Sequence, residues 1–471
     1  MINNQILNSL TLLTVSGFEV NPTRLVTVSI LGIAFLVFLI IKIKVHAFVS
    51  LLVAALIIGI AIGMTPQMII TSMNTGVATT MQGIAILVGI GSMFGALLEK
   101  TGGAEVITTK MLKVFGEKKA VWAMAIAGII IAIPVFFDAA LLIVIPLAFG
   151  LARKTKKSTL LYGIPLIAGL SASHAMLPPT PGPIIVADIL GVDLGYVILA
   201  GFISAPIAVL FAGPIYGKYI NNKINAEIPE VYKQELQKGE SKKTPSFGLV
   251  VGVIFIPLML ILLNTGSNAM LASGNHDWLE HVRPILLFVG HPPISLLIAT
   301  LFAMFFLGTK HGYNKSEIGE FMGKSLTPVG MILLVTAGGG VLRFIFEDSG
   351  LGAVAGTFVA EQNIPIILVA FLIAAVARIS LGSATVAMMM SAGILAGMPL
   401  VAELNPMQLA ALTIAIASGG TFCSHFNDSG FWLVKSLFDI SERDTLRTWT
   451  VITIIIGIVG LVVSSLIYMV A

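Results

Sequence analysis

Charge is scarce in this sequence of 471 residues: 11% of them are Asp, Glu, Lys or Arg, whereas 57% are hydrophobic. A soluble globular domain carries about 25% charged residues, so the composition excludes an ordinary soluble protein. The mean hydropathy is +1.00, and apolar runs long enough to span a bilayer recur along the whole chain. The sequence therefore predicts an all-α polytopic membrane protein, embedded in a lipid bilayer, with no separate soluble domain.

Cysteine is almost absent as well. The single Cys423 excludes an intramolecular disulfide and a metal cluster held by several thiolates. His276, His281 and His291 lack convincing metal-ligand spacing, and we expect no metal and no cofactor. The pI is about 9.0, but the cations lie in short loops between apolar runs, which is typical of membrane topology and not of nucleic-acid binding. No Lys or Arg precedes Arg24, so we expect no cleavable signal peptide.

Two sets of five apolar segments are predicted to span the membrane. The first set lies at about 24–41, 46–63, 82–99, 159–190 and 196–217, and the second at about 247–263, 284–307, 326–346, 406–434 and 449–470. The stretch 218–246 between the sets is rich in lysine, which predicts a cytoplasmic location. We therefore divide the chain into a first repeat, 1–217, a cytoplasmic linker loop, 218–246, and a second repeat, 247–471.

Two further apolar stretches, about 120–151 and 364–400, do not fit simple spans. Basic residues flank the first at both ends, whereas Asp348 and Glu361 precede the second and Glu403 follows it. Each stretch would then enter and leave the membrane on one side, and the two would do so from opposite sides. This predicts two re-entrant hairpins in halves of inverted topology, an arrangement of many secondary transporters. The alternative is that each stretch forms two ordinary spans.

Two of the predicted spans, 159–190 and 406–434, are broken near the middle by Pro, Gly and polar residues. Each break contains a Ser-His pair, and His174 and His425 are 251 residues apart. Irregular backbone at membrane depth is tolerated only where it is buried in protein or lines a cavity. Interrupted segments at matching positions of two halves are the best sequence indication of a transporter's binding site.

The hairpins also carry polar or helix-breaking residues at their centres. Asp138 ends the stretch Pro134-Val-Phe-Phe-Asp138, and Arg378 precedes a Gly-Ser-Ala-Thr turn that ends at Thr385. We expect the four irregular segments to meet near the middle of the membrane. Helix N-termini after each break suit a carboxylate, Arg378 offers it two hydrogen bonds, and the Ser, Thr and Asn side chains suit hydroxyl groups. The predicted solute is a small anionic hydroxy acid.

We predict that residues of the hairpin centres and the broken spans bind this solute. The predicted substrate-binding residues are Phe137, Asp138, Ser173, His174, Thr180, Gly182, Arg378, Gly382, Ser383, Thr385, Ser424, His425, Asn427 and Ser429. The candidates for the coupling proton are Asp138 first and Asp428 second, then His174 and His425, since Asp, Glu and His form the proton relays of transporters.

Structural roles stay open for several of these residues. Each histidine can be a hydrogen-bonded strut, and Arg378 can bridge two helices. Asp428 can cap a helix that begins near Ser429, because Asp is a favoured N-cap residue. The prolines of 178–183 are expected to shape the unwound span and not to touch the solute.

At these motifs the chain resembles the gluconate permease family of bacterial proton symporters for gluconate and related hydroxy acids. The matching stretches are Pro134-Val-Phe-Phe-Asp138, 173–183, Gly338-Gly-Gly340 with Asp348-Ser-Gly350, 382–387 and 424–432. The resemblance implies membership of the ion transporter superfamily and a place in the bacterial inner membrane. It also implies a homodimer with a scaffold domain, a mobile transport domain and elevator-type alternating access.

The sequence departs from that family at two places. Sugar-acid members commonly have Glu where this chain has Asp138, and a small residue followed by Gln where it has Ser380 and Leu381. The missing polar side chain changes hydroxyl recognition, so glycerate, D-serine and other short hydroxy or amino acids are candidates beside gluconate. The predicted function is proton-coupled uptake of gluconate or a related monocarboxylate. The alternatives are a sodium-coupled carrier or antiporter and, from other classes, a channel or an intramembrane enzyme.

Overall fold

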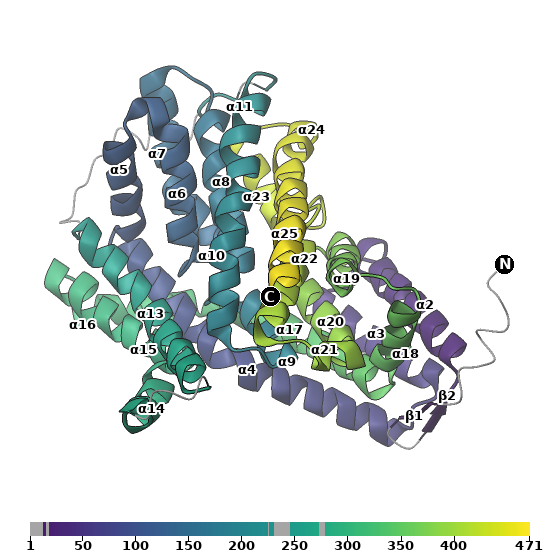
Figure 1. The fold of residues 1–471 in the computed structure, drawn as a ribbon. Helices are drawn as coiled ribbons and strands as arrows, with labels where there is room; N and C mark the ends of the chain where they lie inside the picture. Colours follow the sequence, from purple (N-terminus) through teal and green to yellow (C-terminus); the bar gives the residue numbers. More distant parts are fainter. Residues whose placement is uncertain (1–12, 16–17, 225, 230–244, 273–277) are drawn as a thin grey trace.

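The computed structural model describes residues 13–15, 18–224, 226–229, 245–272 and 278–471, and these residues are helical almost throughout (Figure 1). A small antiparallel hairpin of β1 (Leu13–Val15) and β2 (Phe18–Val20) precedes the first helix. Within the described residues, eight helices are long and apolar enough to cross a membrane. The predicted all-helical membrane class is confirmed.

The first half of the chain runs from α2 to α11. Its helices are α2 (Pro22–Ile41), α3 (Ala47–Ile62), α4 (Pro66–Lys100), α5 (Gly103–Phe115), α6 (Ala120–Ala132), α7 (Phe137–Thr155), α8 (Leu160–Met176), α9 (Pro181–Leu190), α10 (Leu194–Leu210) and α11 (Tyr216–Asn221). A 3₁₀ turn (Glu117–Lys119) precedes α6, and a π-helical turn (Phe211–Ile215) joins α10 to α11. The predicted linker 218–246 lies partly outside the described residues.

The second half runs from α13 to α25. Its helices are α13 (Phe247–Ala272), α14 (Trp278–Val289), α15 (Pro292–Phe302), α16 (Lys315–Ser325), α17 (Thr327–Asp348), α18 (Leu351–Glu361), α19 (Ile366–Leu381), α20 (Ala384–Ala396), α21 (Pro399–Ala402), α22 (Pro406–Thr421), α23 (Ser429–Phe438), α24 (Glu442–Thr445) and α25 (Val451–Val470). Short π-helical or 3₁₀ turns lie at Ala303–Gly308, Thr309–His311 and Leu446–Thr450.

Two of the predicted spans have the wrong extent. The span predicted at 82–99 is the second part of α4, a single helix of 35 residues. Its polar first part stays helical because its hydroxyl groups find partners; Ser72 Oγ donates to the Asp348 carboxylate at 2.5 Å. The span predicted at 284–307 is divided, since α14 ends at Val289 and α15 begins at Pro292. Gly290 and the two prolines that follow His291 interrupt it.

Both predicted hairpins are helix–turn–helix units. Pro134 lies in the short turn between α6 and α7, where it ends α6 because it lacks an N–H group. Between α19 and α20, Gly382 has a φ of +74° and Ser383 Oγ then accepts a hydrogen bond from the Val386 N–H at 3.5 Å. Both predicted broken spans are likewise two helices, α8 with α9 and α22 with α23.

The two Ser-His pairs, however, do not occupy equivalent places. His174 is still within α8, which ends at Met176, whereas His425 lies in the break between α22 and α23. The helices after the breaks begin at Pro181 and Ser429, which are 248 residues apart, and the histidines are 251 apart. Aligning the two halves by their Ser-His pairs therefore differs by three residues, almost one helical turn, from aligning them by their helix starts.

A close helix crossing joins the two halves. A Cβ on Gly76 of α4 would lie 2.7 Å from the carbonyl oxygen of Gly340 in α17, and a Cβ on Gly340 would lie 2.1 Å from Thr80 Oγ1. Small residues permit such backbone contact in membrane proteins. Further along, Ser92 Oγ donates to the Ser325 carbonyl at 2.7 Å. Helices α4 and α17 therefore form one tightly joined pair.

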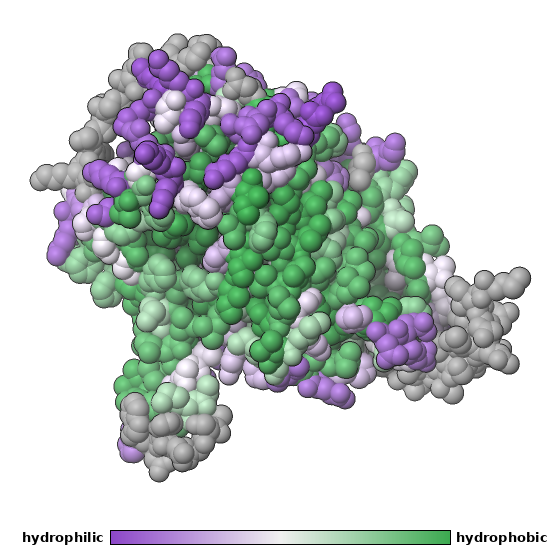
Figure 2. Space-filling view, turned by 45° about the horizontal axis from the view of Figure 1, so that its top comes forward, coloured by the Kyte–Doolittle hydropathy of each residue, from purple (hydrophilic) through white to green (hydrophobic). Residues whose placement is uncertain are grey.

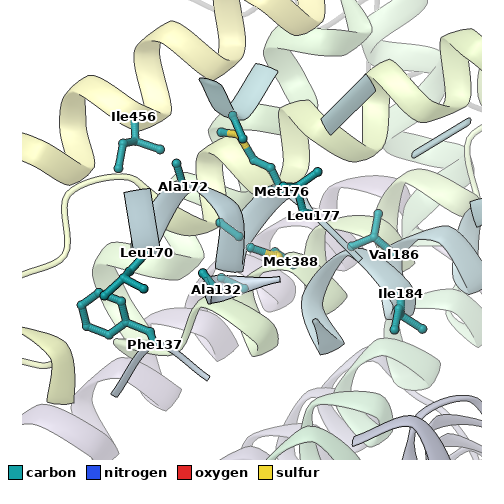
Figure 3. Packing of buried hydrophobic residues seen from close by; sticks show 14 of the residues in the cluster. Ala132, Phe137, Leu170, Ala172, Met176, Leu177, Ile184, Val186, Met388 and Ile456 are labelled. Atoms are coloured by element: carbon teal, nitrogen blue, oxygen red, sulfur yellow. The ribbon is translucent and has the colours of Figure 1, made fainter. Parts of the chain in front are cut away.

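The apolar core surrounds the breaks and the hairpin turns. Figure 3 shows part of it near the end of α8, with Phe137, Leu170, Met176, Val186 and Met388. The molecular surface has a different distribution. Figure 2 shows polar residues gathered over one end of the molecule, above a broad apolar surface. In Figure 1 this is the end that carries α11, α24 and the end of α7, which includes Arg153 and Lys154.

Candidate functional site

One cavity of about 610 Å³ lies where both hairpin turns and both broken segments come together. Pockets for small molecules commonly measure about 300–1,000 Å³. Its lining includes eleven of the fifteen predicted site residues: Phe137, Asp138, His174, Gly182, Arg378, Gly382, Ser383, Thr385, Asn427, Asp428 and Ser429. As expected, all four irregular segments contribute residues to one cavity.

The first half contributes a carboxylate and an imidazole. Asp138, in the first turn of α7, is exposed to the cavity and makes no hydrogen bond or ion pair with any described residue. His174 lines the same cavity from α8, its ring edge-on to Phe136 with centroids 5.9 Å apart. The Nδ1 atom of His174 is buried without a hydrogen-bond partner among the described residues. Both side chains are thus available to a solute.

The second half contributes a buried ion pair. Arg378, of which 5% is exposed, donates one hydrogen bond to the Asp428 carboxylate and another to the Gly382 carbonyl. Asp428 also accepts from the Gly430 N–H at 3.2 Å and so caps α23. The geometry supports the structural alternatives for Arg378 and Asp428, although both still line the cavity.

Two glycines allow close contacts in the cavity wall. A Cβ on Gly382 would lie 2.1 Å from the Asn427 carbonyl oxygen, and a Cβ on Gly182 would lie 2.6 Å from Met388 Sδ. Asn427 Nδ2 in turn donates to the Ile379 carbonyl at 2.7 Å. These contacts join the second hairpin turn to both broken segments.

Four helices begin at this cavity: α7, α9, α20 and α23 each contribute a residue of their first turn. A helix N-terminus presents unpaired N–H groups and a partial positive charge of roughly half a unit. No side chain caps α7, whose N-cap residue is Phe136, or α9, where Thr180 Oγ1 instead donates to the Leu177 carbonyl at 2.7 Å. The cavity is consequently suited to an anion.

Four predicted residues do not line the cavity: Ser173, Thr180, Ser424 and His425. Ser173 is fully buried in α8, and the ring of His425 is a strut, with Nε2 at 3.1 Å from the Ile379 carbonyl oxygen. The three-residue displacement of the Ser-His pairs explains why His174 reaches the cavity and His425 does not.

Other lining residues were not predicted from the sequence. Helix α4 contributes Ser92 and Glu99, and Ser325 is the last residue of α16. Ser171 comes from α8, Thr421 from α22, Trp449 from the π-helical turn before α25 and Thr453 from α25. Glu99 pairs with Lys100 at 2.9 Å. The polar residues inside α4 were a usable signal, because a long helix with Ser and Glu on an otherwise apolar surface has to face protein or water.

Relatives of known name match almost the whole chain. The family described as GntP family permease matches residues 24–470. The low-affinity gluconate transporter of Escherichia coli strain K12 is 36% identical over 447 residues, which cover 94% of this chain and 98% of that protein. The gluconate permeases of Pseudomonas aeruginosa and Bacillus subtilis are 34% and 35% identical, with 92% of this chain covered in each case and 95% and 96% of theirs.

Two solved transporters share the fold. The YdaH transporter of Alcanivorax borkumensis aligns with a TM-score of 0.57 at 12% identity, over 83% of this chain and 87% of that one. MtrF of Neisseria gonorrhoeae, described among antimetabolite efflux pumps, aligns with a TM-score of 0.60 at 14% identity, over 93% and 96%. At these identities the likeness concerns the architecture alone.

Proposed function

We propose that this chain, which belongs to the GntP family of permeases, imports gluconate or a related small hydroxy monocarboxylate together with protons across a bacterial inner membrane. Like its relatives, it is a multi-pass membrane transporter and not an enzyme. The observation that carries the proposal is the cavity at which four helices begin. The uncapped N–H groups at the starts of α7 and α9, in α9 that of Gly182, bind a carboxylate, and Ser383, Thr385 and Asn427 bind hydroxyl groups.

Asp138 is our candidate for the coupling proton. It is the lining carboxylate that has no partner among the described residues, whereas Asp428 is paired with Arg378 and Glu99 with Lys100. An ionised Asp138 repels an incoming anion in a cavity of low dielectric constant. Its protonation removes that repulsion, so the proton and the anion bind together.

We further propose the architecture that accompanies this mechanism. The two halves are related by inverted topology, the hairpins are re-entrant, and the loop 218–246 is cytoplasmic. In support, Gly102 and Gly350 precede α5 and α18 with φ of +77° and +78° and lie 248 residues apart. The crossed pair α4 and α17 belongs to the scaffold, past which the hairpins and broken helices move. A homodimer is part of this proposal through the family resemblance, and light scattering of the purified protein in detergent tests it.

Short hydroxy and amino acids are candidate solutes beside gluconate because of Leu381. This side chain lines the cavity, whereas Ser380 Oγ is bonded to the Val376 carbonyl at 2.7 Å. The lining is thus apolar at Leu381, where a hydroxyl-rich chain of six carbons would need a donor or acceptor. Glycerate and D-serine place fewer hydroxyl groups there than gluconate does.

The test is uptake of radiolabelled gluconate, glycerate and D-serine into proteoliposomes under an imposed inward proton gradient. We expect accumulation of at least one of the three, abolished by a proton ionophore. For a monovalent anion such as gluconate or glycerate, a one-to-one symport is electroneutral and insensitive to membrane potential, whereas each further proton adds about 2.3 kcal/mol per 100 mV. Uptake that requires Na⁺ and ignores the ionophore would assign the chain to the sodium-coupled alternative.

Asp138→Asn removes the proposed proton site while keeping a side chain of the same size. We expect stimulation by the proton gradient to fall by a factor of about 5–150, the range of typical coupling between two ligands. Exchange of internal for external solute should persist, because the neutral side chain resembles the protonated aspartate. The matched control is Asp188→Asn, an exposed aspartate of α9 outside the cavity lining. Full gradient stimulation in Asp138→Asn would contradict the assignment.

A further inference from the structure

A π-helical turn, Leu446–Thr450, lies directly before α25. π-helical turns are rare, occur mostly as single turns and are frequent at functional sites. Trp449 lies in this turn, and although only 3% of its surface is exposed, it lines the cavity. The mechanism proposed above assigns Trp449 no role, but its hydrogen bond and its ring contact indicate a role in positioning other residues of the cavity.

The residues around this turn hold every polar group of Ser424. Trp449 Nε1 donates to Ser424 Oγ at 2.7 Å. Thr450 Oγ1 donates to the Ser424 carbonyl at 2.6 Å, and the Ser424 N–H donates to Thr453 Oγ1 at 3.0 Å. Ser424 lies in the irregular segment between α22 and α23, where no helix ladder fixes the backbone. The π-helical turn and the first residues of α25 therefore fix the backbone of this break.

Ser424 connects Trp449 to the ion pair of Asp428 and Arg378 through hydrogen bonds. Its hydroxyl donates to Asp428 Oδ2, the oxygen that also accepts from Arg378, while Oδ1 accepts from the Gly430 N–H. The hydrogen bonds therefore run in one direction, from the indole through the hydroxyl to the carboxylate, and such chains strengthen one another. Both oxygens of Asp428 therefore already accept hydrogen bonds from groups of the protein.

The indole also reaches the other hairpin. The rings of Trp449 and Phe137 have centroids 5.0 Å apart and planes inclined by 36°. A Cβ on Gly430 would lie 3.0 Å from Trp449 Cζ2 and 3.6 Å from Phe137 Cε1, so the two rings and the start of α23 are closely packed. Phe137 directly precedes Asp138. Trp449 thus contacts the hairpin turn that carries Asp138, and it is hydrogen-bonded to the broken segment that carries Asp428.

We propose that Trp449 is a positioning residue that fixes the Asp428–Arg378 pair relative to the hairpin turn carrying Asp138. The inference rests on the proposed function, because Trp449 would hold the Asp428–Arg378 pair and the turn with Asp138 in the relative position that the solute requires. Trp449→Phe keeps an aromatic ring against Phe137 and removes only the N–H donor. We expect KM for the transported acid to rise about tenfold, the effect of one lost hydrogen bond, with the maximal rate within twofold.

The matched control is Trp432→Phe. Trp432 Nε1 also donates to a backbone carbonyl of the second break, that of Phe426 at 2.8 Å, but Trp432 is exposed and does not line the cavity. Its substitution should leave KM within twofold. Ser424→Ala removes the middle member of the same hydrogen-bond chain, so it should raise KM by a similar factor. The double variant with Trp449→Phe should have a KM no higher than that of the more impaired single variant, because both changes break one chain.

A spectroscopic measurement separates positioning from a general structural role. The chain has four tryptophans, and replacing Trp122, Trp278 and Trp432 with Phe leaves Trp449 as the fluorophore. We expect the transported acid to change its emission with a midpoint near KM. If the wild type accumulates the acid but Trp449→Phe keeps its KM, or the emission does not respond, the positioning role is wrong and the proposed function stands. If the wild type accumulates none of the three acids, both are wrong.

Discussion

Arg378→Ala is expected to lower the free energy of unfolding by about 3–5 kcal/mol and to abolish uptake of the hydroxy acid. Arg378 is 5% exposed, and its guanidinium donates to the Asp428 carboxylate and the Gly382 carbonyl. Without it, a carboxylate that is only 13% exposed has no cation to compensate it. Removing one partner of a buried ion pair is strongly destabilising because the other charge is left alone. Thermal unfolding in detergent and proteoliposome uptake measure the two effects.

A double variant tells the two effects apart. Arg378→Ala with Asp428→Asn no longer buries an uncompensated charge, so we expect it to recover most of the lost melting temperature. Uptake should stay absent, because the turn at Gly382 and the start of α23 have lost the contact that holds them together. A single Arg378→Ala variant with wild-type stability and wild-type KM would show that this ion pair is dispensable.

Gly382→Ala is expected to be the most damaging glycine substitution in the cavity wall. The residue has a φ of +74°, and a Cβ there would lie 2.1 Å from the carbonyl oxygen of Asn427. The left-handed conformation alone costs an L-residue about 1–2 kcal/mol. The overlap with backbone has to be relieved by separating the second hairpin from the second broken segment. We expect uptake to be lost and the melting temperature to fall by more than the conformational cost explains.

Gly191→Ala is the matched control for that overlap. Gly191 also ends a helix, α9, at a φ of +68°, but nothing lies within 4 Å of its hypothetical Cβ. This variant should show the conformational cost of about 1–2 kcal/mol and retain uptake. Equal stability and uptake in the two variants would mean that the contact between Gly382 and Asn427 does not hold the site together.

The sequence was sufficient to predict most of the helices and the segments that line the cavity, because both depend on local chemistry. Helices end at Pro134, at the run of prolines after Leu177 and at Gly382, as their backbone chemistry favours. Apolar length identifies most spans. Those rules placed the two hairpin turns and the two breaks, and eleven of the fifteen predicted residues line the cavity.

What the sequence did not show depends on contacts between distant segments. The polar start of α4 is helical because Ser72 reaches Asp348 and Gly76 packs on Gly340, and no local pattern contains those pairs. Trp449 was missed because its proposed role comes from a hydrogen bond to Ser424, which lies 25 residues earlier in the chain. The Ser-His pairs misled because sequence identity ignores where a helix ends; α8 continues past His174, and α22 stops before His425.

The four helix starts that meet at the cavity have a consequence for how the permease responds to acid. The partial charge of a helix end comes from peptide groups, which neither gain nor lose a proton across the physiological range. This part of the attraction for a carboxylate therefore stays constant while the medium changes. Only the side chains titrate, and Asp138 stands unpaired among them. In the proposed mechanism, protonation of Asp138 therefore sets when the anion binds, and the main chain sets the preference for an anion.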